Sequence, residues 1–175
     1  MCIRDRHTGV DFKQTISSAK LNFKNKKIIR GGSTITQQLI KMAFLSKERS
    51  YLRKLREITG ALILERLLDK DQILTIYVNN VHFGQGLDGV KQAARFYADT
   101  TPQLLTIEDS IRFALVLPRP APRSAAILNE ALGDFAKKRY LLIAKRMFEA
   151  GYITSQQMEN TLSMGNFGSP LKAEK

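Results

Sequence analysis

The chain has 175 residues, 43% of them hydrophobic, which suffices for one domain with a hydrophobic core. A single cysteine and two widely separated histidines exclude a disulfide framework and a His/Cys metal cluster, and no apolar run approaches the roughly 20 residues that span a bilayer. The net charge is +12, and the segment from Lys20 to Arg56 contains eleven basic residues and one acidic residue. This excess favours a phosphate-bearing partner (nucleic acid, an anionic membrane or a phosphorylated substrate) over a merely solvated basic face.

The apolar residues recur at helical spacing nearly throughout, and no alternating strand pattern stands out, so the sequence predicts a mainly α fold. A Pro-rich stretch, "PRPAP", predicts an extended linker between the later helices. The expected helices cover residues 11–24, 34–45, 51–68, 70–80, a segment ending near 97, a segment from 106 to before 118, 129–150, and a short last helix capped by Ser155.

Pairs of polar residues three positions apart mark the starts of three of these helices, as in a capping box. The pairs are Thr34 with Gln37, Asp69 with Gln72, and Thr106 with Asp109. Gly151 is the residue expected just beyond the long helix, because glycine readily takes the left-handed conformation that ends helices.

The stretch "GGSTITQQLIK" (31–41) offers more polar groups than a helix start requires. The first-turn amides and the helix dipole form an anion site beneath the two glycines. Helical spacing aligns Thr34, Gln38 and Lys41 on one face, while Ile35, Leu39 and Met42 are expected to face the core. The alternative is a well-capped core helix with an isolated lysine.

The next expected helix carries a second set of charged groups. Arg53 and Lys54 lie four and three residues before Glu57, so all three side chains can meet. Small residues at 60 and 61 continue that side and are expected to leave room for a ligand. A simple exposed ion pair is the alternative. This helix carries apolar Leu55, Ile58 and Leu62 on one face.

These stretches resemble the signatures of the family 51 glycosyltransferases, the peptidoglycan polymerases of class A penicillin-binding proteins and monofunctional transglycosylases. "GGSTITQQLIK" looks like the second signature, and "RKLREITGALILE" (53–65) looks like the third, R-K-x-x-E-x-x-x-A-x-x-L-E. "KDQILTIYVNNVHFGQG" (70–86) resembles the fourth, and "AARFY" with "SIRFALVLPRPAP" resembles the fifth region.

The resemblance implies a lysozyme-like helical fold with a smaller membrane-contacting lobe. It also implies the reaction: lipid II is polymerised into glycan strands with inversion at the anomeric carbon and release of polyprenyl diphosphate. A growing glycan strand and cell-wall synthesis proteins would be its partners, and a divalent cation, Mg²⁺ or Mn²⁺, its cofactor. The location implied is the outer, periplasmic face of the bacterial cytoplasmic membrane.

The residues that match the family's motifs are assigned roles by the resemblance. Glu57 would support the leaving diphosphate, through a divalent ion or through the neighbouring basic residues. The expected substrate-binding residues are His7, Ser33, Thr34, Gln38, Lys41, Arg53, Lys54 and Asn79.

The first signature, E-D-x-x-F-x-x-H-x-G, is matched only at its end, by "HTG" (7–9). Counting back from His7 puts the general-base glutamate before Met1, and "MCIRDR" does not fit the rest. The domain is therefore expected to cover 7–164, with a non-matching start at 1–6, no anchor helix and a loose tail at 165–175. As written, the chain is expected not to polymerise lipid II, since a positioned base contributes roughly 10²–10⁴-fold.

Two other readings fit part of the sequence. A basic helical nucleic-acid-binding protein accounts for the charge of +12 but not for the polar order of "GGSTITQQL", and aromatic residues for base stacking make up only 8%. A lysozyme-like peptidoglycan hydrolase would need an acidic glutamate in a cleft and no diphosphate site. The resemblance favours the glycosyltransferase, with no nucleic-acid partner.

Overall fold

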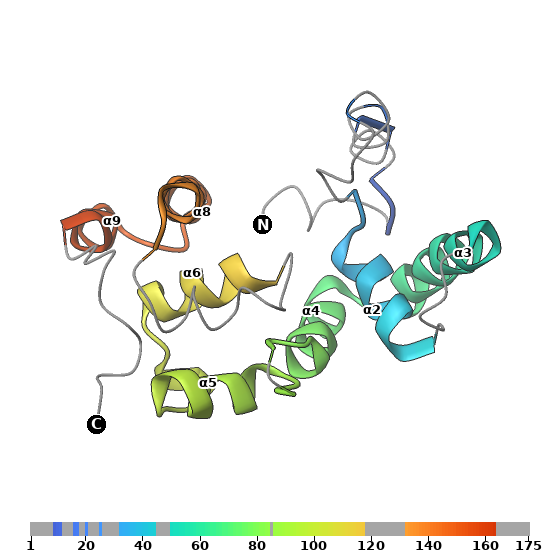
Figure 1. The fold of residues 1–175 in the computed structure, drawn as a ribbon, viewed down its shortest axis with the longest axis horizontal. Coiled ribbons are helices and arrows are strands. Elements are labelled where there is room, and N and C mark those ends of the chain that lie inside the picture. Colours follow the sequence, from blue (N-terminus) through green and yellow to red (C-terminus); the bar gives the residue numbers. More distant parts are fainter. Residues whose placement is uncertain are drawn as a thin grey trace. The chain divides into compact units, whose positions relative to one another are not determined.

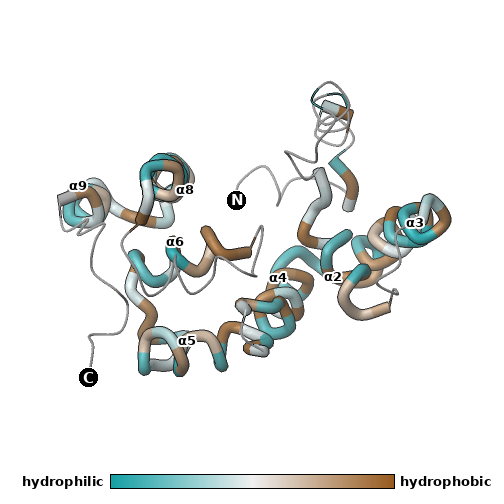
Figure 2. Tube along the Cα trace, in the orientation of Figure 1, coloured by the Kyte–Doolittle hydropathy of each residue, from teal (hydrophilic) through white to brown (hydrophobic). Residues whose placement is uncertain are grey.

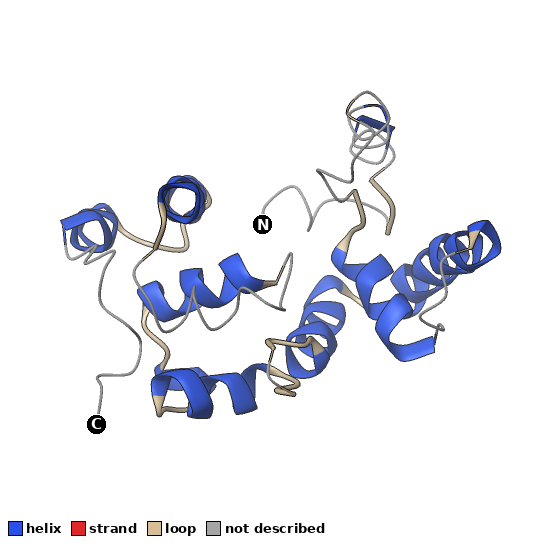
Figure 3. Cartoon of the chain, in the orientation of Figure 1, coloured by secondary structure: helices blue, strands red, loops and turns tan. Residues whose placement is uncertain are grey.

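The structure, a computed structural model, describes residues 9–11, 16–17, 20, 25, 32–44, 50–84, 86–117 and 132–163. Within these residues all secondary-structure elements are helices (Figures 1 and 3), which confirms the predicted mainly α fold. The helices are α2 (Ile35–Phe44), α3 (Tyr51–Leu67), α4 (Lys70–Asn80), α5 (Val90–Ala98), the 3-10 helix η1 (Pro102–Leu104), α6 (Ile107–Val116), α8 (Asp134–Glu149) and α9 (Ser155–Ser163). Most of the expected helix 11–24, the Pro-rich linker and the tail from 165 lie outside the described residues.

The chain divides into two compact units, residues 2–78 and residues 79–175. The first unit holds α2, α3 and most of α4, and the second holds α5, η1, α6, α8 and α9. None of the described helices is both long enough and apolar enough to cross a lipid bilayer.

In the first unit, α2 packs on α3. Ile35 and Leu39 are buried as predicted, and Ile40 joins them. Met42, which the sequence placed toward the core, is 38% exposed, so that expectation is wrong. The buried face of α2 therefore includes Ile40 in place of Met42. Ile40 is buried because it packs against Gly60 of α3.

The apolar face of α3 is largely exposed. Leu55 is 60% exposed and Leu62 is 39% exposed. The buried residues of α3 are Glu57 and Ala61, on the opposite side of the helix. The side of α3 that faces α2 is thus partly polar, and the leucine-rich side faces outward. Figure 2 shows apolar segments, in brown, on both α2 and α3.

In the second unit, α6 packs on α8 and α8 packs on α9. The core cluster between α6 and α8 is apolar apart from a tyrosine hydroxyl, and it consists of Ile111, Leu115, Leu132, Tyr140 and Ala144. Arg112 on the same helix is fully buried, and its Nε donates to Glu108 Oε1 at 3.2 Å. This pairing compensates for the burial of a guanidinium, which would otherwise be costly.

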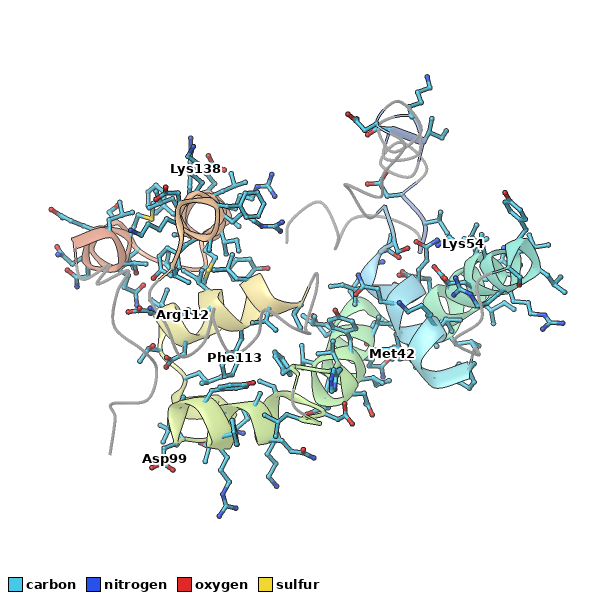
Figure 4. The ribbon with its side chains drawn as sticks, in the orientation of Figure 1. Met42, Lys54, Asp99, Arg112, Phe113 and Lys138 are labelled. Carbon is cyan, nitrogen blue, oxygen red and sulfur yellow. The ribbon has the colours of Figure 1, made fainter. Side chains whose placement is uncertain are left out.

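An aromatic contact joins α5 and α6 within the second unit. The ring of Phe113, labelled in Figure 4, lies 5.4 Å from that of Phe83 and 6.4 Å from that of Tyr97, centroid to centroid. Phe83 follows α4, on a loop that Gly89 closes by donating its N–H to Val81 O at 2.9 Å. Gly89 has φ +81°, and a Cβ there would lie 2.2 Å from the carbonyl oxygen of Asn79. The loop therefore closes onto the end of α4 only with glycine at this position.

Most predicted helix ends are confirmed. Asp69 with Gln72 and Thr106 with Asp109 form reciprocal capping pairs, and Gly151 follows the C-cap of α8 with φ +74°. Two boundaries differ. Helix α8 begins at Asp134 rather than 129, because Gly133 before it is extended. The cap of α9 is Thr154, which exchanges hydrogen bonds with Gln157, and not Ser155.

Candidate active site

Four polar residues meet where α2 begins and the first turns of α3 pass it, and we call them the Glu57 cluster: Ser33, Arg53, Lys54 and Glu57. Arg53 Nη1 lies 3.2 Å from Glu57 Oε2, and Lys54 forms an ion pair with Glu57 Oε1. Lys54 Nζ also donates to Ser33 Oγ at 3.1 Å. Figure 4 shows Lys54 beside α2 and α3. The predicted meeting of Arg53, Lys54 and Glu57 is confirmed.

The Glu57 cluster has an excess of positive charge. Glu57 is only 2% exposed, and its two oxygens are held by the two cations and by the Ser33 hydroxyl at 3.5 Å. Two cations against one carboxylate leave a net charge of +1. Arg53 Nε is buried and has no hydrogen-bond partner among the described residues. The cluster therefore keeps both charge and N–H donors for an anion, which a simple ion pair would not.

Gln38 connects the cluster to α4. Its Nε2 donates to the carbonyl oxygen of Ser33 at 3.5 Å, and its Oε1 accepts from Tyr77 Oη at 3.0 Å. Tyr77 is fully buried, so this amide is held at both ends. The sequence did not single out Tyr77, although "IYVNN" in the fourth signature contains it.

Thr34 is the N-cap predicted for α2. Its backbone N–H donates to Gln37 Oε1 at 2.9 Å, and the N–H of Gln37 donates to Thr34 Oγ1 at 3.1 Å. The hydroxyl of Thr34 also donates to the carbonyl oxygen of Gly9 at 2.7 Å, and the residue is 3% exposed. The capping box thus occupies two of the N–H groups at the helix start that were expected to face an anion.

A second polar cluster lies two turns further along α3, and we call it the Glu65 cluster: Thr36, Glu65 and Lys70. Thr36 Oγ1 and Lys70 Nζ both donate to the carboxylate of Glu65. Like the Glu57 cluster, it combines a hydroxyl from the start of α2, a carboxylate from α3 and a lysine. The charges of the Glu65 cluster balance, however. The sequence did not predict this cluster, because Glu65 and Lys70 lie in different helices.

Three further predicted site residues are Lys41, Asn79 and His7. Lys41 is exposed in the last turn of α2, two turns beyond Thr34, and within the described ranges it forms no ion pair with Glu57. Asn79 is exposed near the end of α4, and it belongs to the second unit. His7 lies outside the described residues.

The small residues of α3 leave no room for a ligand, contrary to the sequence-based expectation. A Cβ added at Gly60 would lie 3.0 Å from Ile40 Cγ2, so α2 already fills that space. Ala61 is fully buried, and its carbonyl oxygen would lie 3.0 Å from a Cβ added at Gly9. Gly60 and Ala61 thus serve close packing of the backbone.

The divalent cation implied by the resemblance finds few protein ligands near Glu57. Both carboxylate oxygens are engaged by Arg53 and Lys54, and across the described ranges no group of three or more His, Cys, Asp or Glu side chains could hold a metal ion. A Mg²⁺ ion held through this one carboxylate would take its other ligands from substrate phosphates and water. The donor set fits an arrangement in which Arg53 and Lys54 supply the positive charge.

The fold and the site define a class of helical protein in which a buried carboxylate pairs with two cations. The comparisons make the class specific: the family model described as Transglycosylase matches residues 5–148. The chain belongs to this transglycosylase family, as the resemblance indicated.

Similar curated proteins include a penicillin-binding protein and biosynthetic peptidoglycan transglycosylases. The chain is 36% identical over 157 residues to penicillin-binding protein 1A of Aquifex aeolicus, covering 90% of this chain and 21% of the relative. It is 39% identical over 142 residues to the biosynthetic peptidoglycan transglycosylase of Paraburkholderia phytofirmans (81% and 57%), and 42% identical over 114 residues to that of Cupriavidus metallidurans (65% and 49%). The chain thus spans between about a fifth and three fifths of the length of these relatives.

Proposed function

We propose that this chain is a peptidoglycan glycosyltransferase domain and that the Glu57 cluster binds the diphosphate of its lipid-linked substrate. The observation that supports this most directly is the charge of the cluster, +1 with N–H donors to spare, in a chain of the transglycosylase family. Lipid II and the growing glycan strand are the substrates that the family implies.

In the reaction, a sugar hydroxyl of the acceptor forms a bond to the anomeric carbon of the donor while the bond from that carbon to the diphosphate oxygen breaks. The proton of the hydroxyl passes to a general base, a role that the resemblance gives to the glutamate of the first signature. The electron pair of the broken bond leaves with the diphosphate. Arg53 and Lys54 would stabilise the charge that develops there, which is where preorganised cations lower a barrier most. Glu57 orients these two cations. Its own oxygens are already engaged, so it is poorly placed to take the acceptor's proton.

Titration with farnesyl diphosphate tests the site. Lys54→Ala removes one charge-assisted hydrogen-bond donor and should weaken binding by about 10- to 100-fold, from roughly 1.5–3 kcal/mol. Lys70→Ala is the matched control, because Lys70 is also paired with a glutamate of α3 but belongs to the neutral Glu65 cluster. Equal effects of the two substitutions, or no binding by the unchanged chain, would contradict the proposed site.

Lys41 and Arg53 were both expected to bind phosphate, and the same titration separates them. Arg53→Ala should weaken farnesyl diphosphate binding as Lys54→Ala does. Lys41→Ala should weaken it by about 1–3 kcal/mol if the diphosphate extends along α2 beyond the cluster. Unchanged affinity in Lys41→Ala would remove that residue from the site without affecting the assignment of Arg53.

The outward face of α2 and α3 fits an anionic membrane surface, and we propose that it lies against one. Large apolar side chains are exposed there beside exposed basic residues: Met42, Phe44, Tyr51, Leu52, Leu55, Leu62, Ile63 and Leu67, with Lys41, Arg56 and Arg66. An apolar helix face flanked by cations is typical of helices that lie at a membrane surface. The basic segment 11–29 was expected to act likewise and lies mostly outside the described residues.

Sedimentation with phosphatidylglycerol vesicles tests the membrane face. The double variant Leu55→Gln/Leu62→Gln should bind at least tenfold more weakly, since burying each leucine is worth roughly 1.5–3 kcal/mol. The control is Leu141→Gln/Leu142→Gln, because both residues are similarly exposed, on α8 of the other unit. Equal losses in the two double variants, or retention of binding in the first, would count against this face.

A further inference from the structure

Thr34 lies in the signature that the family uses for substrate binding, yet its side chain is directed into the protein. It is 3% exposed, and its hydroxyl both accepts from the N–H of Gln37 and donates to Gly9 O at 2.7 Å. A hydroxyl has one hydrogen to donate, and here Gly9 receives it. In this arrangement Thr34 has no donor left for a sugar or a phosphate.

Gly9 is held on its other side by α3. Its φ of +86° lies in the left-handed region, and an added Cβ would be 3.0 Å from both the carbonyl oxygen of Ala61 and Cγ of Glu65. The glycine therefore lies between the start of α2 and the middle of α3, where only a residue without a side chain fits. The contact partner on α3, Glu65, is itself fixed by Thr36 and Lys70.

We propose that Thr34 is a positioning residue: its hydroxyl holds Gly9 against Ala61 and Glu65 of α3, and it does not bind the substrate. Gly9 is the last residue of "HTG", the part of the first signature that this chain matches. Docking Gly9 fixes that end of the first signature against the helices that carry the second and third. The reaction requires the three signatures to act together, so this part of the inference rests on the proposed function.

The test combines hydrogen exchange with diphosphate binding in the full chain. Thr34→Val keeps the size of the side chain and removes the hydroxyl, and it should raise amide exchange across residues 9–11 at least tenfold. Thr34→Ser restores the hydroxyl and should restore protection. Gly9→Ala leaves Thr34 and its cap intact but blocks docking, so it should raise exchange at 9–11 and leave α2 protected. The double variant Thr34→Val/Gly9→Ala should exchange no faster at 9–11 than the single variants.

Farnesyl diphosphate binding then separates docking from substrate contact. Gly9→Ala and Thr34→Val should bind within about twofold of the unchanged chain, whereas Lys54→Ala binds at least tenfold more weakly. Unchanged exchange at 9–11 in Thr34→Val, or a tenfold loss of affinity in Thr34→Val that Gly9→Ala does not share, overturns the proposal. If the unchanged chain binds no farnesyl diphosphate, the proposed function fails, and the exchange pattern alone still decides whether Thr34 docks Gly9.

Discussion

Glu57 and Glu65 lie on the same helix, α3, and have different roles. Each is a carboxylate of α3 that accepts from a hydroxyl at the start of α2 and from a lysine. Arg53 makes the difference, because it adds a second cation to Glu57, and Glu65 has only Lys70 as an ion-pair partner among the described residues. We infer that the surplus cation at Glu57 serves a ligand and that the balanced Glu65 cluster serves the packing of the helices.

This distinction predicts the effect of Glu65→Gln. The substitution removes the charge that Lys70 pairs with and weakens the hydrogen bond from the buried Thr36, so unfolding in urea should show a loss of about 1–3 kcal/mol. Affinity for farnesyl diphosphate should stay within twofold of the original. A loss of affinity without a loss of stability would place Glu65 in the binding site instead.

The contact between Gly60 and Ile40 predicts a coupling between these residues. Alanine is favoured over glycine within a helix by about 1 kcal/mol, but its Cβ would lie 3.0 Å from Ile40 Cγ2. Gly60→Ala should therefore stabilise the protein in an Ile40→Ala background and fail to do so in the original chain. A double-mutant cycle from urea unfolding measures this coupling. Equal effects of Gly60→Ala in both backgrounds would show that Ile40 does not restrict a Cβ at position 60.

At the scale of the helices, local signals in the sequence were more informative than the hydrophobic pattern. The capping pairs at Thr34, Asp69 and Thr106 form as predicted, since each depends only on residues three positions apart. The start of α8 and the cap of α9 were misplaced, by five residues and by one. Helix α8 begins only after the extended Gly133, and Thr154 rather than its neighbour Ser155 caps α9.

The face of α3 could not be read from its sequence. Leu55 and Leu62 look like a core stripe, and only the packing of α2 on the other side shows that Glu57 and Ala61 are buried. Hydrophobic spacing identifies an apolar face but not what covers it. Which face of a helix is buried is hardest to predict where the helix has polar partners inside the protein and an apolar environment outside it.

Within the candidate site, the sequence predicted what lies on one helix and missed what joins different helices. Arg53, Lys54 and Glu57 are neighbours by helical spacing alone. The contacts of Ser33 with Lys54, of Tyr77 with Gln38 and of Thr34 with Gly9 depend on how separate segments pack, and the sequence pattern carried no such information.

The capping box of α6 offers a test at this scale. Thr106 Oγ1 accepts from the N–H of Asp109, and the carboxylate of Asp109 accepts from the N–H of Thr106. Thr106→Ala should lower the free energy of unfolding by about 1 kcal/mol, and Thr106→Ser should cost little because it keeps the oxygen. Equal losses in both variants would mean that the methyl group, and not the cap, is responsible.

At the scale of the whole molecule, most of the basic excess lies in residues 2–78, with 16 Lys+Arg against 7 Asp+Glu, but the site that we propose uses only part of it. The Glu57 cluster lies within residues 2–78, and within the described residues it involves Arg53 and Lys54. The other exposed cations on α2 and α3, Lys41, Arg56 and Arg66, belong to the face that we propose for an anionic membrane. Membrane association should therefore weaken with salt, which screens exposed charges more than buried ones.

Stability at high pH should depend on Tyr140 in the second unit. Burial, and next the nearby carboxylate of Glu108, raise the pKa of Tyr140 to about 12 from about 10. The folded form favours the neutral hydroxyl, so its contribution to stability is complete below pH 10 and is lost as the pH rises from about 10 to about 12. Urea unfolding over this range should show a smaller decline in Tyr140→Phe than in the original chain, and parallel declines would contradict it.

The closing of the 81–89 loop by Gly89 limits which substitutions a working gene can tolerate. Every other amino acid carries the Cβ that would lie 2.2 Å from the carbonyl oxygen of Asn79, whereas a Cβ added at Gly133 meets nothing within 4 Å. In a library of random variants selected for folded protein, position 89 should remain glycine while position 133 diversifies. Gly89 would then tolerate substitution as little as any charged residue of the site, and the reason would be steric alone.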